Sequence, residues 1–212
     1  MLRKVLATLA FGIVTVGVGQ AATLTPGGTA TPTSIAFPGG TLELFTGATV
    51  SSGTAFTATY NIQIISDPSN ALCANCLDFV YQVANSATLS TDALTSYAVG
   101  NFNSVATSVF FSPSVIGTVI PSSVTRSSDG GTIDFLFGSP ITPGATSDFM
   151  IVETNVAPGS FAAGFTTIKG TGTDTATGLG ATAVSPEPAS FVLLGSGLLG
   201  LAGAAKRKFA KA

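Results

Sequence analysis

The amino-acid sequence predicts an all-β protein: an antiparallel β-sandwich of the immunoglobulin-like or jelly-roll type, flanked by an N-terminal signal helix and a C-terminal transmembrane helix. Apolar and polar residues alternate in several short runs of its middle part, and turn residues separate these runs. No stretch of that middle part shows a sustained helical periodicity. Long apolar runs beside basic residues occur at the two ends, where the two helices are expected.

The clearest predicted strand covers residues 56–64, where apolar and polar side chains alternate with the period of a half-buried strand. A Ser-Asp-Gly-Gly sequence at residues 128–131 predicts a hairpin turn between two further strands. The other predicted strands lie at residues 77–83, 132–137 and 148–153, with shorter ones at residues 42–45, 108–111, 115–120 and 161–168.

The charge pattern excludes one class of partner. Charged residues make up 8% of the chain, against roughly 25% in a typical soluble domain. Of the eight basic residues, only Arg126 and Lys169 lie away from the ends, and ten acids accompany them, so the middle part carries a charge of roughly −8. A nucleic-acid-binding protein needs a positive face. Nucleic acid is therefore not expected as a partner.

Residues 1–21 have the layout of a cleavable signal peptide. Arg3 and Lys4 form its positive region, residues 5–18 form its apolar region, and Gly19 and Ala21 are small residues of the kind that a signal peptidase reads. Cleavage is predicted after Ala21, with Ala22 as the nearby alternative. An uncleaved anchor or a buried helix is the competing interpretation, but Gly and Thr residues inside the stretch favour a signal peptide.

Residues 186–212 form a three-part tail: a Pro-Glu-Pro motif at residues 186–188, an apolar run at residues 189–205 and a basic stretch at residues 206–212. At about 1.5 Å per residue, a helix of this run is just long enough to cross a thin bilayer core. The basic residues should remain on the cytoplasmic side, which leaves everything before the motif outside. These basic residues are Lys206, Arg207, Lys208 and Lys211.

This tail resembles a PEP-CTERM sorting signal, because motif, span and basic stop occur together and in this order. The usual pattern has Val directly before the first Pro, whereas this chain has Ser185 there. The resemblance is limited to the tail. It implies that an exosortase-type enzyme recognises Pro186, Glu187 and Pro188 and cuts near them. An ordinary single-pass anchor with a chance Pro-Glu-Pro is the alternative.

The two ends together predict a route and a set of partners. Signal peptidase and the exosortase-type enzyme are the expected processing partners, and the inner membrane is a transient or permanent anchor. The precursor is expected to keep its N-terminal part outside and its tail in the cytoplasm. The mature form is then expected at the cell surface or outside the cell. The resemblance also implies bacteria that make exopolysaccharide and biofilm, which adds extracellular polysaccharide as a candidate partner.

Composition divides the remaining chain into three segments. Residues 22–34 are rich in Thr, Pro and Gly and are interpreted as a lead-in, with an irregular first strand as the alternative for residues 23–40. Residues 35–169 hold the predicted strands and form the extracytoplasmic β-sandwich domain. Residues 170–185 are mainly Gly, Thr and Ala without apolar periodicity, which predicts a flexible linker between the domain and the tail.

Cys73 and Cys76 are the two cysteines of the chain. In an exported protein they are predicted to form a structural disulfide that fixes the turn before a strand. A redox site is the alternative, but it would need a helix N-terminus after the first cysteine, and residues 77–83 alternate like a strand. A metal site and unpaired thiols are the other interpretations.

The residue types present limit the chemistry. The chain has no His and shows no phosphate-binding loop motif, so no triad built on His and no cofactor or metal is expected. Paired carboxylates suffice for glycoside hydrolysis, and Asp78, Asp134 and Glu153 lie on predicted strands. Surface solubility explains these acids more simply.

Three functions remain open. The favoured one is a non-catalytic exported β-domain of the cell surface or extracellular matrix, linked to exopolysaccharide or biofilm. A secreted polysaccharide hydrolase with paired carboxylates is the alternative. A third is ice or surface binding by regular Thr rows, although the Thr residues are plentiful without being periodic from strand to strand.

Overall fold

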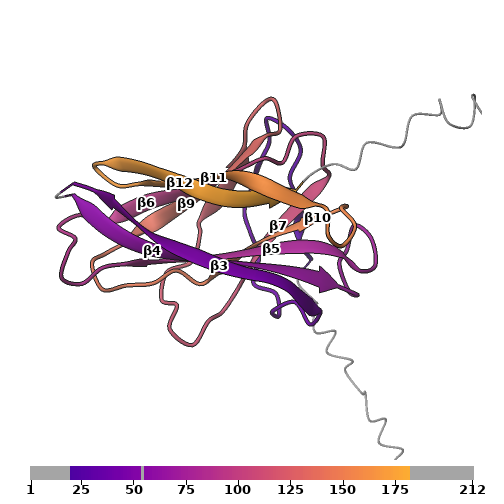
Figure 1. Cartoon of the computed structure of the whole chain (residues 1–212), viewed down its shortest axis with the longest axis horizontal. Coiled ribbons are helices and arrows are strands. Elements are labelled where there is room, and N and C mark those ends of the chain that lie inside the picture. The colour runs from indigo at the N-terminus through magenta and orange to yellow at the C-terminus, as the bar shows by residue number, and fades with distance from the viewer. Residues whose placement is uncertain (1–19, 54, 182–212) are drawn as a thin grey trace, which may run out of the picture.

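The structure, a computed structural model, describes residues 20–53 and 55–181. Within this part every regular element is a strand, and the strands form two six-stranded sheets that face each other (Figure 1). Each ladder between named strands is antiparallel. The predicted all-β architecture is confirmed, whereas the two flanking helices were predicted for residues outside the described part.

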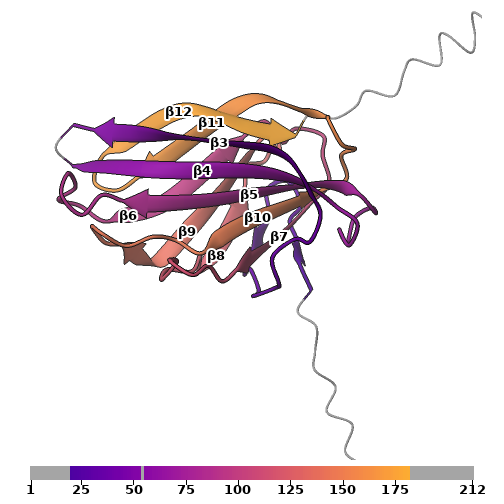
Figure 2. The same ribbon diagram turned by 60° about the horizontal axis from the view of Figure 1, so that its bottom comes forward.

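One sheet, called sheet A, has its strands in the order β1 (Ala22–Thr23), β7 (Thr107–Ser112), β10 (Phe149–Thr154), β5 (Cys76–Asn85), β4 (Phe56–Asp67) and β3 (Thr41–Ser52). The other, called sheet B, has the order β12 (Thr173–Ala181), β11 (Phe161–Lys169), β6 (Leu94–Gly100), β9 (Thr132–Ile141), β8 (Ser123–Arg126) and β2 (Thr29–Ala30). The long edge strands β3 and β12 lie on the same side of the sandwich (Figure 2).

The main core lies between the two sheets and follows the period-two pattern of the sequence. Sheet A contributes every second residue of β4 and β5, and sheet B contributes the inward residues of β6, β9 and β11. Burying each large apolar side chain contributes about 1.5–3 kcal/mol. The largest fully buried side chains include Phe56, Ile64, Phe79, Tyr81, Tyr97, Ile133 and Phe135.

A smaller apolar cluster lies on the opposite, outer face of sheet A. Ile65, Val80, Phe110 and Ile151 are buried there, and the N-terminal segment packs on them through Ile35. Residues 22–34 are likewise part of the sandwich, which agrees with the interpretation of this segment as irregular strand and not with that of a lead-in outside the domain. This segment holds β1 and β2, and its Leu24 is a fully buried core residue. Thr, Pro and Gly dominate its composition, so the few apolar anchors produced no recognisable period.

The linker prediction is wrong for most of its length. Residues 173–181 form β12, which pairs with β11 from Lys169↔Thr173 to Phe161↔Ala181. Backbone hydrogen bonds hold this strand, and Gly and Thr side chains leave little trace of the alternation that identifies strands in a sequence. The structure also shows β6 and β8, which were not predicted.

The strand predicted at residues 115–120 is absent. Pro113 and Pro121 bracket this segment, and neither can donate to a sheet ladder. It crosses as a loop instead, held by the bond from the Thr118 N–H to the Thr146 carbonyl. By contrast, the hairpin predicted at residues 128–131 is confirmed. Gly130 adopts φ +75° there, and the Ser127 N–H donates to the Thr132 carbonyl at 2.9 Å.

A buried arginine joins the two sheets near β1 and β2. Arg126, at the end of β8, is 4% exposed and donates five hydrogen bonds between 2.8 and 3.0 Å. Burial lowers the pKa of its guanidinium, which nevertheless stays charged at neutral pH. The acceptors are the carbonyls of Leu24, Phe102, Val105 and Gly130 and the hydroxyl of Thr107.

Two tyrosine hydroxyls of sheet A hold β12 at the other side. Tyr60 on β4 donates to the Thr177 carbonyl at 2.6 Å, and Tyr81 on β5 donates to the Leu179 carbonyl at 3.1 Å. Both rings are buried, and burial raises the pKa of each phenol, so both hydroxyls keep their protons. β12 thus pairs with β11 of sheet B along one edge, and two of its carbonyls accept hydrogen bonds from sheet A.

We predict that Arg126→Lys lowers the free energy of unfolding by at least about 3 kcal/mol, because a single ammonium cannot satisfy four buried carbonyls spread around a guanidinium. Chemical denaturation measures the change. Lys169→Arg, which alters a half-exposed base on the outer face of sheet B, should change it by less than about 1 kcal/mol. Equal stability of Arg126→Lys and the parent would contradict this account of the fold.

We predict that Tyr60→Phe and Tyr81→Phe each lower the free energy of unfolding by about 1–2 kcal/mol, since each leaves one β12 carbonyl unpaired. Tyr97→Phe is the matched control: Tyr97 is equally buried, but its hydroxyl makes only a 3.5 Å contact with the Thr166 hydroxyl. A larger loss from Tyr97→Phe than from the other two would show that β12 does not depend on these bonds.

Candidate functional site

The sorting residues themselves lie outside the described part of the chain. This holds for Pro186, Glu187 and Pro188, for the predicted span at residues 189–205 and for Lys206, Arg207, Lys208 and Lys211. The structure instead fixes what precedes them. β12 ends at Ala181, so only residues 182–185 separate the last strand of the sandwich from the motif.

At the other end, Gly19 also lies outside the described residues, whereas Ala21 packs on the small outer cluster of sheet A. β1 begins at Ala22, directly after the predicted cleavage point. Cleavage after Ala21 stays a prediction. Among the residues that the structure describes, no helix has the length and apolar character needed to span a membrane.

The edges of β3 and β12 approach each other at one end and separate at the other. The Ser51 N–H donates to Oδ2 of Asp174 at 2.9 Å where the strands meet. Where they separate they enclose a groove of about 490 Å³, which we call the edge groove. Its lining carries no acid and no base, so it offers no catalytic carboxylate. The lining residues are Leu44, Phe45, Thr46, Gly47, Ala48, Tyr60, Ala176, Thr177, Gly178 and Leu179.

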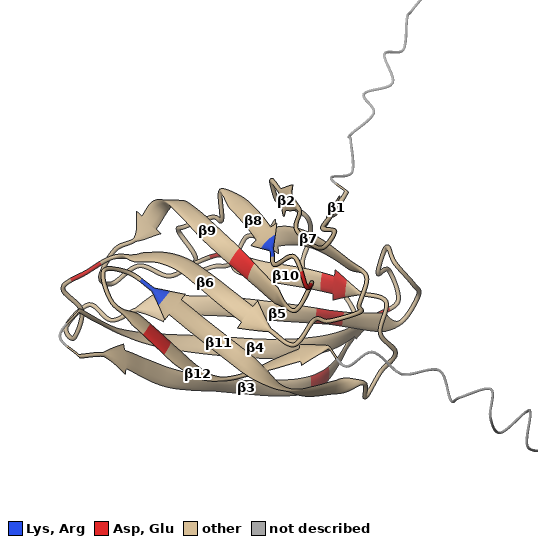
Figure 3. Ribbon diagram, turned by 90° about the horizontal axis from the view of Figure 1, so that it is seen from above, with Lys and Arg blue, Asp and Glu red and all other residues tan. Residues whose placement is uncertain are grey.

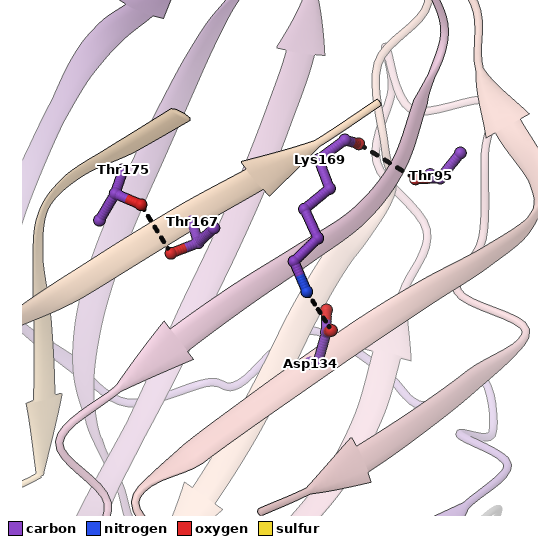
Figure 4. Close-up of polar contacts among 5 residues, drawn as sticks. All are labelled: Thr95, Asp134, Thr167, Lys169 and Thr175. Atoms are coloured by element: carbon purple, nitrogen blue, oxygen red, sulfur yellow. Dashed lines mark hydrogen bonds and ion pairs between the residues drawn. The ribbon is translucent and has the colours of Figure 1, made fainter. Parts of the chain in front are cut away.

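The outer face of sheet B carries hydroxyl side chains around one ion pair (Figure 4). Thr167 on β11 and Thr175 on β12 are register partners whose hydroxyls lie 3.1 Å apart. Beside them, Lys169 Nζ lies 3.3 Å from Oδ2 of Asp134 on β9. We call this surface the threonine face; its members are Thr125, Asp134, Thr167, Lys169, Thr173 and Thr175.

Strand register shows that the threonine face is not an unbroken Thr array. One row runs across the sheet from Thr175 and Thr167 to Thr125, but Ala98 and Asp134 occupy its middle positions. Ice or surface binding by regular Thr rows would need a continuous array, so the geometry does not favour that interpretation. The face offers threonine hydroxyls around one ion pair. Figure 3 shows how few positions on the strands of sheet B are charged.

The acids singled out in the sequence separate into two places. Asp134 lies on the threonine face, whereas Asp78 on β5 and Glu153 on β10 are register partners on the outer face of sheet A. Asp67, at the end of β4, joins them, because its charge acts on both of these carboxyls. We call Asp67, Asp78 and Glu153 the acid cluster. All three are buried, with exposed fractions of 6% or less.

Residues 68–75, which we call the cap loop, cover the acid cluster. Asn70 donates its side-chain amide to Oδ1 of Asp78 at 2.7 Å and to the Thr154 carbonyl at 3.2 Å. The Ala71 N–H donates to Oε1 of Glu153 at 3.3 Å. Burial, and then the charges of Glu153 and Asp67, raise the pKa of Asp78 to about 9. Burial also raises the pKa of Glu153.

The cluster is closed rather than set in a cleft, and this limits its chemistry. A glycosidase needs both carboxyls to reach a sugar, and here the cap loop covers them. The described residues also contain no group of three or more acids or cysteines arranged to hold a metal ion. The sequence pattern identified Asp78 and Glu153 but missed Asp67 and Asn70, whose only signal was the Asp-Pro-Ser-Asn turn at residues 67–70.

In the structure, Cys73 and Cys76 form a disulfide, with their Cα atoms 5.5 Å apart. The bond closes the end of the cap loop where β5 begins, and the Cys76 N–H also donates to the Cys73 carbonyl at 3.1 Å. Asn75, between them, adopts φ +62°, a conformation that Asn tolerates better than most residues. The pair thus occupies the position of a turn before a strand, as the structural interpretation expects.

Comparison with known proteins bears on the tail alone. No curated protein and no solved structure matches the chain. The model of the PEP-CTERM protein-sorting motif matches residues 186–208, which include the Pro-Glu-Pro motif, the apolar run and the first basic residues. The chain therefore carries a PEP-CTERM sorting tail, which marks an exported protein sorted by an exosortase-type enzyme.

Proposed function

We propose that the chain is a non-catalytic protein of the cell surface or extracellular matrix, whose β-sandwich is delivered outside the inner membrane and released or retained there through its tail. The observation that carries this proposal is the sorting motif at residues 186–208. Only residues 182–185 separate it from β12, the last described strand of the sandwich. A separately folded domain does not fit in so short a segment. The sandwich is then the cargo of the sorting route.

The proposed topology follows from the tail. Residues 189–205 anchor the precursor in the inner membrane, and the basic stretch keeps the C-terminus in the cytoplasm. The motif then lies at the outer side of the inner membrane. Its two prolines hold the chain extended there, in a form that an enzyme can bind. Because β12 ends at Ala181, the enzyme must approach within a few residues of the folded sandwich.

A matrix role is supported by the surface of the sandwich rather than by any reactive group. The acid cluster lies under the cap loop, and the edge groove is lined without acids. The threonine face presents hydroxyls around one ion pair. Such a face suits contact with a hydrated, neutral polysaccharide, in which hydroxyl groups exchange hydrogen bonds with water and with each other. We propose exopolysaccharide or biofilm matrix as its surroundings.

We predict that Glu187→Ala blocks sorting in producing cells: the protein should accumulate in the membrane fraction at its precursor mass, since the motif is the recognition element. Cell fractionation with mass measurement tests this. Glu43→Ala, which removes an acid from the exposed strand β3, is the matched control and should be released as the parent is. Unchanged release of Glu187→Ala would contradict the proposed route.

We predict that the double variant Thr167→Ala, Thr175→Ala sediments less with extracted neutral polysaccharide than the parent protein does. The matched control is Thr49→Ala, Thr59→Ala, because these residues form an equivalent exposed cross-strand pair on sheet A, with hydroxyls 3.2 Å apart. Equal sedimentation of both variants and the parent would remove the threonine face from the account. It would leave the sorting route untouched.

A further inference from the structure

The acid cluster and the cap loop form a device that the sorting route does not use. We propose that one proton shared within the acid cluster latches the cap loop onto the outer face of sheet A, so that the loop opens locally when the cluster becomes fully ionised at alkaline pH. The inference is independent of the proposed function, since it concerns the folded sandwich alone.

Two carboxyl groups of like charge oppose each other directly in the acid cluster. Asp78 and Glu153 are register partners on neighbouring antiparallel strands, where two like charges destabilise a sheet. No cation compensates them within the described part of the chain. Its two basic residues have other partners: Arg126 donates to backbone carbonyls and to the Thr107 hydroxyl on the core side, and Lys169 pairs with Asp134 on sheet B.

Each of these carboxyls also has one buried oxygen without a hydrogen-bond partner among the described residues. These oxygens are Oδ2 of Asp78 and Oε2 of Glu153. Buried polar atoms are rarely left unpaired, and an unpaired carboxylate oxygen is costly. A proton on Asp78 turns that carboxyl from an acceptor into a donor, and the side chain of the neighbouring acid Asp67 can accept the resulting hydrogen bond. One proton therefore removes the like-charge repulsion between Asp78 and Glu153 and the cost of a buried, unpaired Asp78 carboxylate oxygen.

All but one of the groups that face Asp78 either favour its protonated form or are apolar. Glu153 faces it from β10 and Asp67 from the end of β4, and both are acids; Ile65, its register partner on β4, is apolar. Only Asn70, from the cap loop, stabilises the charged form by donating a hydrogen bond. The pKa of Asp78, raised to about 9 by burial and by these acids, agrees with a neutral carboxyl at pH 7.

Protonation of Asp78 stabilises the folded, latched state more at low pH than at high pH. In the unfolded chain an Asp titrates near pH 4, whereas in the folded protein Asp78 holds its proton up to about pH 9. The folded state therefore binds one more proton between these values. The stabilisation is complete below about pH 4 and is lost as the pH rises through about 9. Within this window, each pH unit lowers the ratio of latched to open molecules by up to roughly tenfold.

The cap loop is the part that responds. It is tied to the acid cluster by the Asn70 amide on Asp78 and the Ala71 N–H on Glu153. A second negative charge at the cluster favours hydration of these carboxylates, and water reaches them when the cap loop, which bonds directly to both, moves away. The Cys73–Cys76 disulfide keeps the end of the loop attached to β5, so the opening remains local and reversible.

The test is hydrogen–deuterium exchange of the cap-loop amides in the exported protein recovered from cells, at pH values from 5 to 10 and corrected for intrinsic exchange rates. In the parent protein, protection of the Ala71, Leu72 and Asn75 amides should fall steeply toward alkaline pH. Asp78→Asn keeps the size of the side chain without an ionisable group and should flatten the dependence. Asp148→Asn, which changes a buried acid bonded to the Ser114 N–H instead, should leave it as in the parent.

Two results would overturn the latch: protection in the parent that does not depend on pH, or a steep dependence that persists in Asp78→Asn. If Asp78→Asn fails to fold, Glu153→Gln serves instead, because loss of one facing acid should move the transition to lower pH. The same series with calcium chloride at about 5 mM, above the roughly 10⁻⁴–10⁻³ M dissociation constants of extracellular calcium sites, separates proton from cation. Calcium-dependent protection at pH 9 in the parent alone would mean that a cation occupies the cluster in place of the proton.

Discussion

The structure depends most on the way β12 is built into the sandwich. This strand is the last one of the domain, and it is held by backbone pairing with β11 and by the hydroxyls of Tyr60 and Tyr81 reaching across from sheet A. Without it, β11 would become an exposed edge, and the rings below would lose their cover. Because this strand ends at Ala181, only residues 182–185 separate the folded domain from the sorting motif. Fold and sorting route therefore meet at one element.

The two sides of the sandwich are secured by different means. On the β12 side, neutral phenols hold carbonyls of a Gly- and Thr-rich strand whose own side chains bury little. On the other side, the Arg126 guanidinium gathers four carbonyls and one hydroxyl where β1 and β2 are too short to close the sheets themselves. A charged donor makes stronger hydrogen bonds than a neutral one, which suits the end with the least strand pairing.

The sequence was informative where side chains alternate and uninformative where the backbone provides the stability. β4 and β5 were predictable because Phe56 to Ile64 and Leu77 to Val83 place large apolar groups at every second position. β12 was not, because its stability lies in ladder bonds and in tyrosines distant in sequence. The acid pair Asp78 and Glu153 was visible as residues, but their opposition depends on strand register. Asp67 and Asn70 join them only through the turn that precedes β5.

We propose that the complete sandwich, with β12, is the exported product. The most direct measurement is the intact mass of the protein recovered from outside its native cells. The account predicts a chain that begins after Ala21, ends near residues 186–188 and contains the oxidised Cys73–Cys76 pair. A mass that still includes residues 189–212, found only in membranes, would contradict sorting. A chain that ends before Thr173 would contradict the role given to β12.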